Sequence, residues 1–324
     1  MVSRQVAEFC DKVRFNKFGG AAEMVKNGVE SIAEASRSCL VNNTSDFAKV
    51  MESDLDSILE VIPSIAPMTN LLHEFMSSIE KVRKEDLRID LAKEEVAKTL
   101  ENYLDRQSRA LEKIGLIGSQ MIKDNSTIAT FSTSGSVMEI FKFAKKEGKK
   151  FKVLVTEARP ANEGIRTMRE IIEMGIPVDF GIDAILGYLI PTSSMFVVGA
   201  DVINSTGDVL VKVGTYLGAL VAREHNIPFF VAADTSKFDP MTLEGFPLKI
   251  NDKGPDVVID QKLPDIVNVM NPSFELIPAR LITGYITELG IIHPGGVSSL
   301  MHQFNLSETL SNKLHKWVDK PVKH

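Results

Sequence analysis

A turn rich in hydroxyl groups is the first segment of this sequence whose residue types suit chemistry. Six of the seven positions in residues 130–136 are Ser, Thr or Gly. Such a turn before a helix offers free backbone N–H groups and the positive end of the helix dipole, and both favour a bound phosphate. We therefore predict phosphate contacts at Thr133, Ser134 and Gly135. The alternative, that these hydroxyl groups only cap the helix, stays open.

Asp201 is the second candidate, because it follows the apolar run Val197-Val198 and a short Gly-Ala step. A carboxyl group in a dry crevice acts as an acid or a base once its pKa is tuned, and Lys212 offers a cation to a phosphate or to that carboxylate. A carboxylate at a strand end is also often a simple cap, so both interpretations stand. No group of His, Cys and acidic residues has metal-ligand spacing, so we predict neither a metal nor a cofactor.

Short β-branched or aromatic runs alternate with amphipathic stretches from residue 127 onward, and these elements must position the candidate turns. The runs that predict strands are residues 127–131, 151–156, 178–182, 195–199, 227–232 and 266–269. Between them, residues 137–147 and 216–225 predict helices. Strands separated by helices predict an α/β fold with a doubly wound, mainly parallel, Rossmann-like sheet. Ligands bind such sheets beyond the carboxyl ends of the strands, where the candidate turns lie.

The N-terminal third has a different pattern, in which apolar residues recur at helical spacing. Such stripes occur in residues 21–40 and along a charged stretch at residues 87–123. We therefore predict a helical domain over residues 1–120 and a Rossmann-like ligand-binding domain over residues 121–324, to which the family resemblance described below adds dimerisation.

Composition narrows the class of protein. The net charge is −6, from 37 Lys and Arg against 43 Asp and Glu, and no dense basic tract occurs, so direct nucleic-acid binding is disfavoured. Cys10 and Cys39 have no disulfide or zinc spacing, which fits a reducing cytosol. The sequence has neither a signal-peptide core nor a run of about 18 apolar residues, so we expect a cytoplasmic protein without membrane contact.

Several segments between about residues 100 and 300 carry a resemblance to a known family. They are Thr156-Glu157-Ala158-Arg159-Pro160, Val198-Gly199-Ala200-Asp201, Lys212-Val213-Gly214-Thr215, residues 227–233, Lys237-Phe238, Asn271-Pro272-Ser273-Phe274-Glu275 and residues 286–292. Together they resemble the family that joins the α, β and δ subunits of translation initiation factor 2B with methylthioribose-1-phosphate isomerase and archaeal ribose-1,5-bisphosphate isomerase. The resemblance implies a helical domain on a Rossmann-like domain, dimerisation through the latter, and a phosphorylated sugar or nucleotide bound between the domains. It also implies that Glu157, Arg159, Lys212 and Gly214 contact that ligand.

In the isomerases of this family, an Asp and a Cys move protons between C1 and C2 of the sugar. The resemblance places the Asp on Asp201 and the Cys on Ser132. A thiol with a pKa of about 8.5 exchanges protons near neutral pH, whereas an alcohol does not do so unaided. Gly19 and Val211 also stand where the isomerases carry Arg and Asn.

Two hypotheses follow, and we favour the first. The chain is a regulatory relative that binds a phosphorylated sugar or nucleoside monophosphate, or it is an aldose–ketose isomerase of a 1-phosphorylated pentose that uses Asp201. In both cases we expect a homodimer or larger homo-oligomer, with initiation factor subunits as further candidate partners. A nicotinamide-dependent oxidoreductase is disfavoured because no G-x-G-x-x-G follows the first predicted strand.

Overall fold

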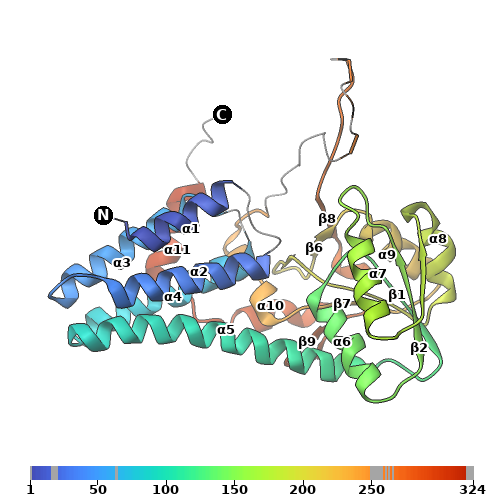
Figure 1. Cartoon of the computed structure of the whole chain (residues 1–324), viewed down its shortest axis with the longest axis horizontal. Coiled ribbons are helices and arrows are strands. Elements are labelled where there is room, and N and C mark those ends of the chain that lie inside the picture. The colour runs from blue at the N-terminus through green and yellow to red at the C-terminus, as the bar shows by residue number, and fades with distance from the viewer. Residues whose placement is uncertain are drawn as a thin grey trace. The chain divides into compact units, whose positions relative to one another are not determined.

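The computed structural model describes residues 2–15, 21–62, 65–248, 258–259, 261, 263–264 and 266–318 (Figure 1). The chain forms two compact units, which we call the helical unit (residues 1–108, 239–247 and 302–324) and the α/β unit (residues 109–238 and 248–301). These limits differ from the single boundary expected at residue 120. The reason is that two later segments return to the helical unit, where Leu310 is buried in the core.

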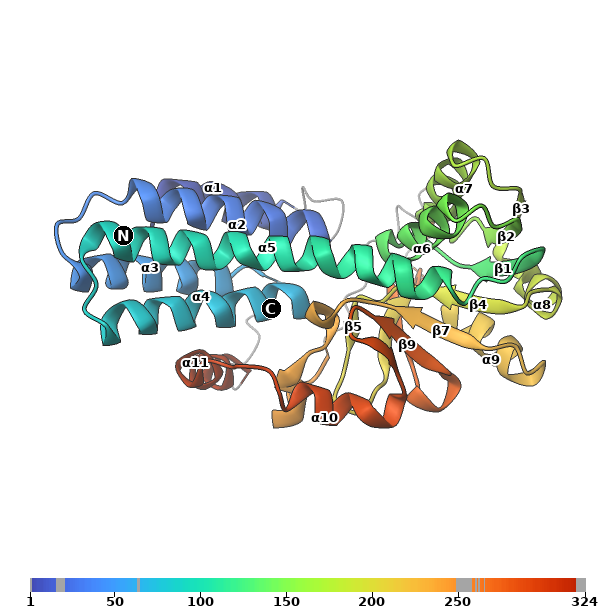
Figure 2. The same ribbon diagram turned by 90° about the horizontal axis from the view of Figure 1, so that it is seen from below.

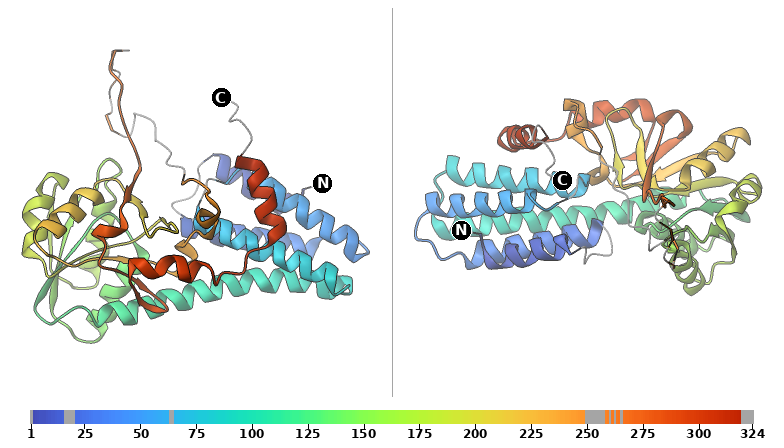
Figure 3. Two further views of the ribbon diagram at one scale, coloured as in Figure 1. Left: turned by 180° about the vertical axis from the view of Figure 1, so that it is seen from behind. Right: turned by 90° about the horizontal axis from the view of Figure 1, so that it is seen from above.

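The helical unit is a bundle of amphipathic helices. Its helices are α1 (Arg4–Arg14), α2 (Ala21–Ser38), α3 (Thr44–Leu59), α4 (Ala66–Lys84), the first part of α5 (Ile89–Ser119) and α11 (Glu308–Val318). Figure 2 shows α1 to α4 lying side by side, and Figure 3 shows α11 beside α4. Apolar stripes such as that of Phe47, Met51 and Leu55 meet in a fully buried core, because residues three and four apart share one helix face.

The α/β unit is built on a seven-stranded sheet in the order β10-β9-β7-β4-β1-β2-β3. All neighbours are parallel except β10, which is antiparallel to β9. The strands are β1 (Ser126–Thr130), β2 (Phe151–Thr156), β3 (Val178–Gly181), β4 (Met195–Val198), β7 (Phe229–Ala232), β9 (Gly284–Thr287) and β10 (Gly290–Ile292). A small antiparallel sheet holds β5 (Val202–Ile203), β6 (Val209–Lys212) and β8 (Phe274–Ile277).

Helices cover both faces of the large sheet. They are α6 (Gly135–Lys146), α7 (Glu163–Glu173), α8 (Leu186–Leu189), α9 (Thr215–Glu224) and α10 (Val297–Met301). Alternate residues of β4 point to opposite faces: Val197 packs in one core with Phe141 of α6 and Ile171 of α7, whereas Phe196 lies against Gly218 of α9. Figure 2 shows the same division, with α6 and α7 on one side and α8 and α9 on the other.

The predicted doubly wound α/β fold is confirmed, and five of the six predicted strands are present within a few residues of their expected ends. The strand predicted at residues 266–269 is wrong, because the described residues there form no strand. Ile266 is 94% and Val267 46% exposed, so these apolar side chains are not packed as an interior strand requires. The next strand of the sheet beyond β7 is instead β9, in which all four residues are buried. Within the described residues, no helix is both long and apolar enough to cross a membrane.

Candidate functional site

The candidate site lies beyond the carboxyl ends of the parallel strands, within the α/β unit. Ser132 follows β1, Asp201 follows β4 and Lys237 follows β7 in a short 3-10 helix, Thr235–Lys237. The small sheet adds Lys212: the Asp201 N–H donates to the Leu210 carbonyl at 3.0 Å, which sets the end of β6 beside Asp201. Residues that are far apart in the chain are thus brought to one edge of the sheet.

A hydroxyl, a carboxylate and an ammonium group form a continuous chain at this edge. The Ser132 Oγ donates to Glu163 Oε2 at 2.6 Å, and Lys212 Nζ lies 2.9 Å from Glu163 Oε1. The side chains of Lys212 and Glu163 are only 11% and 27% exposed, so water screens this ion pair less than it screens a surface pair. Lys212 Nζ also lies 5.3 Å from the centre of the Phe274 ring, where it gains a cation–π contact.

The start of α7 is held close to β2, and this places Glu163. A Cβ on Gly164 would lie 1.7 Å from the Thr156 carbonyl oxygen, so only glycine allows this approach. The Gly164 N–H donates to the Glu157 carbonyl at 3.0 Å, and the Thr167 hydroxyl donates to the Ser132 carbonyl at 2.8 Å. The first turn of a helix also favours a negative side chain, which suits Glu163.

Asp201 has an environment that alters its acidity. It is half-buried, and its carboxylate accepts no hydrogen bond from any described residue. Burial raises the pKa of Asp201 most strongly; the ammonium groups of Lys237 and Lys212 oppose this, and the Glu163 carboxylate adds to it. A carboxyl group whose pKa is raised exchanges protons more readily near neutral pH, as an acid/base group requires.

The hydroxyl-rich turn caps α6 and leaves open space beside it. Ser134 is the N-cap, and its Oγ accepts the Val137 N–H at 3.3 Å. A Cβ on Gly199 would come within 2.4 Å of that oxygen, so β4 and α6 approach closely here. Thr133 and Gly135 are exposed, and a Cβ on Gly135 would meet nothing within 4 Å. Capping by Ser134 and room for an anion beside Gly135 are therefore compatible.

The start of α9 differs from that of α6, because a carboxylate already occupies it. Glu275 Oε1 accepts the Tyr216 N–H at 2.7 Å, and the same carboxylate bonds the N–H groups of Gly214 and Thr215. Gly214 has a φ of 102°, which glycine adopts readily. Glu275 accepts the Gly214 N–H, so this N–H is not a free donor for a ligand bound at Ser132, Glu163 and Lys212.

Arg159 and Glu157 lie on the turn after β2 but do not join the Ser132–Glu163–Lys212 chain. The Arg159 N–H donates to Asp183 Oδ2 at 2.7 Å, and its exposed side chain donates to the Val258 carbonyl at 2.9 Å. The Glu157 backbone pairs with Gly181 and Gly164. Val211 is buried in β6, and Gly19 lies outside the described residues.

Glu163 was not singled out by sequence reasoning, and Lys237 entered only as part of the family resemblance, without a role in the site. Lys237 belongs to the Lys237-Phe238 segment of that resemblance, and its position shortly after the strand that ends at Ala232 was a further available signal. The only sequence signal for Glu163 was its position before Gly164, and this position does not reveal its contacts with Ser132 and Lys212. In the part of the chain that the structure describes, no three His, Cys, Asp or Glu side chains are grouped so as to hold a metal ion.

Comparison with known proteins places this arrangement in a family. The model of the initiation factor 2 subunit family matches residues 17–294. A ribose 1,5-bisphosphate isomerase of Methanocaldococcus jannaschii is 29% identical over 301 residues, which is 92% of this chain and 95% of that protein. A putative translation initiation factor eIF-2B subunit 2-like protein of Pyrococcus abyssi is 33% identical over 298 residues, covering 91% and 98%.

A solved structure agrees with these sequence matches. The Pyrococcus horikoshii translation initiation factor eIF-2B superposes with a TM-score of 0.73 at 30% identity, covering 90% of this chain and 98% of that one. The fold, the strand-end motifs and the extent of these matches lead to one conclusion: this chain belongs to the initiation factor 2 subunit family, which includes eIF-2B-like proteins and sugar-phosphate isomerases.

Proposed function

We propose that this chain binds a phosphorylated sugar or nucleotide at the Asp201–Lys212 site and acts as a regulatory relative of the isomerases. The observation that carries the proposal is the hydrogen bond from Ser132 to Glu163. The hydroxyl that stands where the resemblance expects a catalytic thiol is held as a donor to a carboxylate. Because an alcohol exchanges protons poorly near neutral pH and this one points its proton at Glu163, Ser132 does not replace the thiol as a direct acid/base partner of Asp201.

The charges of the site support a phosphate-bearing ligand. Lys212 and Lys237 supply two cations, and the start of α6 supplies backbone N–H groups beside open space at Gly135. Glu163 neutralises part of this charge, so a phosphate that reaches Lys212 competes with the Glu163 carboxylate. Such competition limits affinity, which suits a sensor that must release its ligand as concentrations fall.

An active isomerase is the second candidate, and the raised pKa of Asp201 favours it. On this hypothesis Glu163, acting through Ser132, accepts the second proton. The ribose 1,5-bisphosphate isomerases among the relatives add weight to it.

The test combines ligand binding with turnover. We expect phosphorylated pentoses or nucleoside monophosphates to raise the thermal stability of the wild type, because a ligand that binds only the folded state stabilises it. Lys212→Ala should weaken binding about tenfold through the loss of a charged hydrogen bond. Lys152→Ala, which removes an exposed lysine paired with Asp179, is the matched control and should bind normally.

Turnover then separates the two candidates. We expect no isomerisation of ribose 1-phosphates by the wild type, and a gain for Ser132→Cys. A wild-type turnover in the usual range of about 1–10³ s⁻¹ would refute the regulatory proposal and favour the isomerase.

We also propose a two-fold dimer formed through the α/β unit, with initiation factor subunits as further partners. Tyr188 of α8 and Leu217 of α9 are 75% and 61% exposed, and α8 packs on α9, so these apolar side chains gather on one surface. Sedimentation should give a dimer for the wild type and a monomer for Leu217→Glu. A cytoplasmic location fits the free, buried Cys10 and Cys39.

A further inference from the structure

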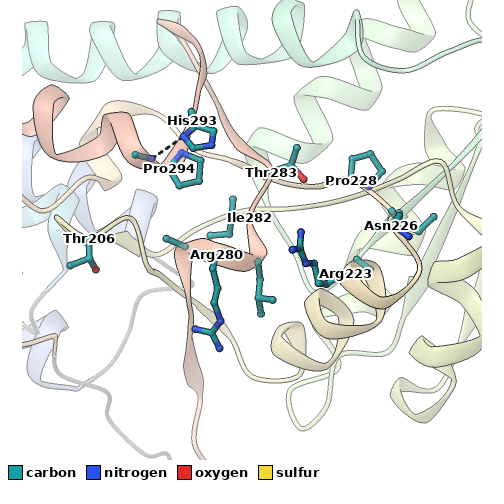
Figure 4. Close-up of a pocket in the computed structure, with 14 residues that line it drawn as sticks. Thr206, Arg223, Asn226, Pro228, Arg280, Ile282, Thr283, His293 and Pro294 are labelled. Atoms are coloured by element: carbon teal, nitrogen blue, oxygen red, sulfur yellow. Dashed lines mark hydrogen bonds between the residues drawn. The ribbon is translucent and has the colours of Figure 1, made fainter.

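A second hollow lies in the α/β unit, at the opposite edge of the sheet from the Asp201 site. Its cavity volume is about 780 Å³, within the range of small-molecule sites. Ile227 and Pro228 of its lining lie just before β7, and Thr283 lies just before β9, so the hollow opens at the amino ends of these parallel strands. Figure 4 shows these residues together with side chains from the end of α9 and from the loop after β10.

The polar lining of this hollow is basic. Arg223 lies in the last turn of α9, Arg280 in the 3-10 helix Ala279–Leu281, and His293 directly after β10. None of the lining residues is acidic, although the whole chain carries a net charge of −6. Both arginines are exposed, and neither forms an ion pair with a described residue. Two guanidinium groups without carboxylate partners favour an anionic ligand.

An acidic side chain that bonds this lining, Asp208, is already engaged. Thr206 lines the hollow, and its hydroxyl donates to Asp208 Oδ2 at 2.8 Å. The other oxygen of Asp208 accepts the Ala279 N–H at 2.9 Å. The Asp208 carboxylate therefore holds the hollow's walls together and does not pair with Arg223 or Arg280.

His293 adds a further hydrogen-bond donor. Its Nδ1 accepts the Gly295 N–H at 3.1 Å, the bond drawn in Figure 4. This contact fixes the neutral ring with its proton on Nε2, so the imidazole offers an N–H to a ligand without needing a charge.

The rest of the wall is apolar. It includes Ile227, Pro228, Leu281, Ile282 and Pro294. A ligand suited to the whole hollow carries an anionic group and an organic part that covers these side chains.

We propose that this hollow binds a small phosphorylated molecule, with its anionic groups at Arg223 and Arg280 and its organic part on the apolar wall. Phosphate is the anion that matches an arginine fork, since it presents several acceptor oxygens. The concave shape and the volume suit a small molecule better than a protein surface, which forms flatter contacts. This site is separate from the one at Lys212.

The test uses the full chain carrying Lys212→Ala, which weakens the first site and leaves the second. Pyrophosphate and adenosine diphosphate are titrated by calorimetry. Pyrophosphate tests the arginines alone, and the nucleotide tests the apolar wall. We expect both probes to bind, and the nucleotide to bind more tightly.

Added substitutions locate the site. Arg223→Ala and Arg280→Ala should each weaken binding about tenfold, and the pair should abolish it. Arg169→Ala, which removes an exposed arginine of α7 outside the hollow, should have no effect. Thermal unfolding and sedimentation establish that each variant is folded and associates as the wild type does.

Three results would overturn the proposal. One is the absence of binding in the Lys212→Ala chain, which would leave the first site as the sole phosphate site. The second is binding that survives loss of both arginines. The third is a double variant, without both arginines, that binds phosphate normally but changes its self-association. The hollow would then be a contact between protein chains.

Discussion

Asp54 in the helical unit and Asp201 in the α/β unit are aspartates withdrawn from water, and their surroundings differ. Asp54 is completely buried, and its two oxygens accept the N–H and the hydroxyl of Ser3, each at 2.7 Å. Asp201 is half-buried, accepts no hydrogen bond from the described residues, and interacts with Lys237 and Lys212 through charge alone. Burial raises the pKa of both carboxyl groups.

This contrast separates a structural role from a functional one. Asp54 joins the start of α1 to α3, so its acceptor capacity is used by the fold. The carboxylate oxygens of Asp201 remain free to accept a hydrogen bond from a ligand or to bind a proton, and they lie beside two cations. A raised pKa is common to both residues, and it is the hydrogen-bond partners that distinguish them.

The ion pairs of the two units differ in the same way. Arg37 and Glu101 of the helical unit form a pair with side chains that are 43% and 46% exposed. Lys212 and Glu163 of the α/β unit are far less exposed. Exposed pairs of the first kind contribute about 0–1 kcal/mol to stability, whereas the second pair withdraws two charges from solvent where a ligand can exchange with them.

The largest effect is expected from Gly164→Ala, which disturbs the position of Glu163 in the functional site. The added methyl would lie 1.7 Å from the Thr156 carbonyl oxygen, so α7 must move and carry Glu163 away from Ser132 and Lys212. We expect a loss of about 3–5 kcal/mol in the free energy of unfolding, which is the range of severe packing defects. Urea unfolding followed by circular dichroism measures it.

Gly135→Ala is the matched control, because Gly135 is also near the start of a helix but has nothing within 4 Å of an added Cβ. It should change the stability by less than about 1 kcal/mol. Equal losses for the two variants would mean that the close approach of α7 to β2 does not hold Glu163 in place.

Much of this architecture follows from local patterns in the sequence. The alternation of apolar runs and amphipathic stretches predicts β1, β2, β4 and β7, which bury most of their side chains, and also β3, which buries none of its residues; Ser134 as a cap needs only its neighbours. The run at residues 266–269 has the same apolar composition as a strand, but its Ile266 and Val267 side chains are exposed, and burial is not a local property.

The site is less predictable, because its contacts join distant residues. Glu163 meets Ser132 and Lys212 only after α7 docks on β2, and no spacing in the sequence encodes that meeting. Gly214 has the residue type of a phosphate contact, yet the carboxylate of Glu275, 59 residues beyond Tyr216, takes the N–H groups at the start of α9. Long-range packing decides which polar groups remain free.

A smaller effect is expected from replacing each of the two aspartates by alanine. Asp54→Ala leaves the two Ser3 donors without an acceptor, and we expect the free energy of unfolding to fall by about 1–3 kcal/mol. Asp201→Ala loses no hydrogen bond and removes a poorly solvated charge, so stability should stay within about 1 kcal/mol of the wild type or rise. Urea unfolding of the two variants side by side checks the difference. A large loss for Asp201→Ala would make this residue structural.

The smallest effect is expected at Asp239, which tests whether every aspartate of the helical unit that is withdrawn from water has its oxygens hydrogen-bonded as Asp54 does. This carboxylate belongs to the helical unit, yet its one hydrogen bond comes from the Met241 N–H at 3.0 Å, and no described cation lies beside it. Burial raises the pKa of Asp239 from 3.8 to about 6. The folded state therefore holds more protons than the unfolded state between these two values, and the wild type loses stability as the pH rises through them.

Asp239→Asn removes this titration and keeps an acceptor for the Met241 N–H. One pKa unit corresponds to about 1.4 kcal/mol, and partial solvent exposure reduces the effect, so we expect Asn to stabilise the chain by about 1–2 kcal/mol at pH 7 and by nearly nothing at pH 4. Asp239→Ala also removes the titration but loses the cap, and should be less stable than Asp239→Asn by about 1 kcal/mol at every pH. Urea unfolding at several pH values checks both. A gain for Asp239→Asn that does not change with pH would contradict the burial of a charge at this position, and Asp239 would then belong with Asp54 as an aspartate whose surroundings fully satisfy it.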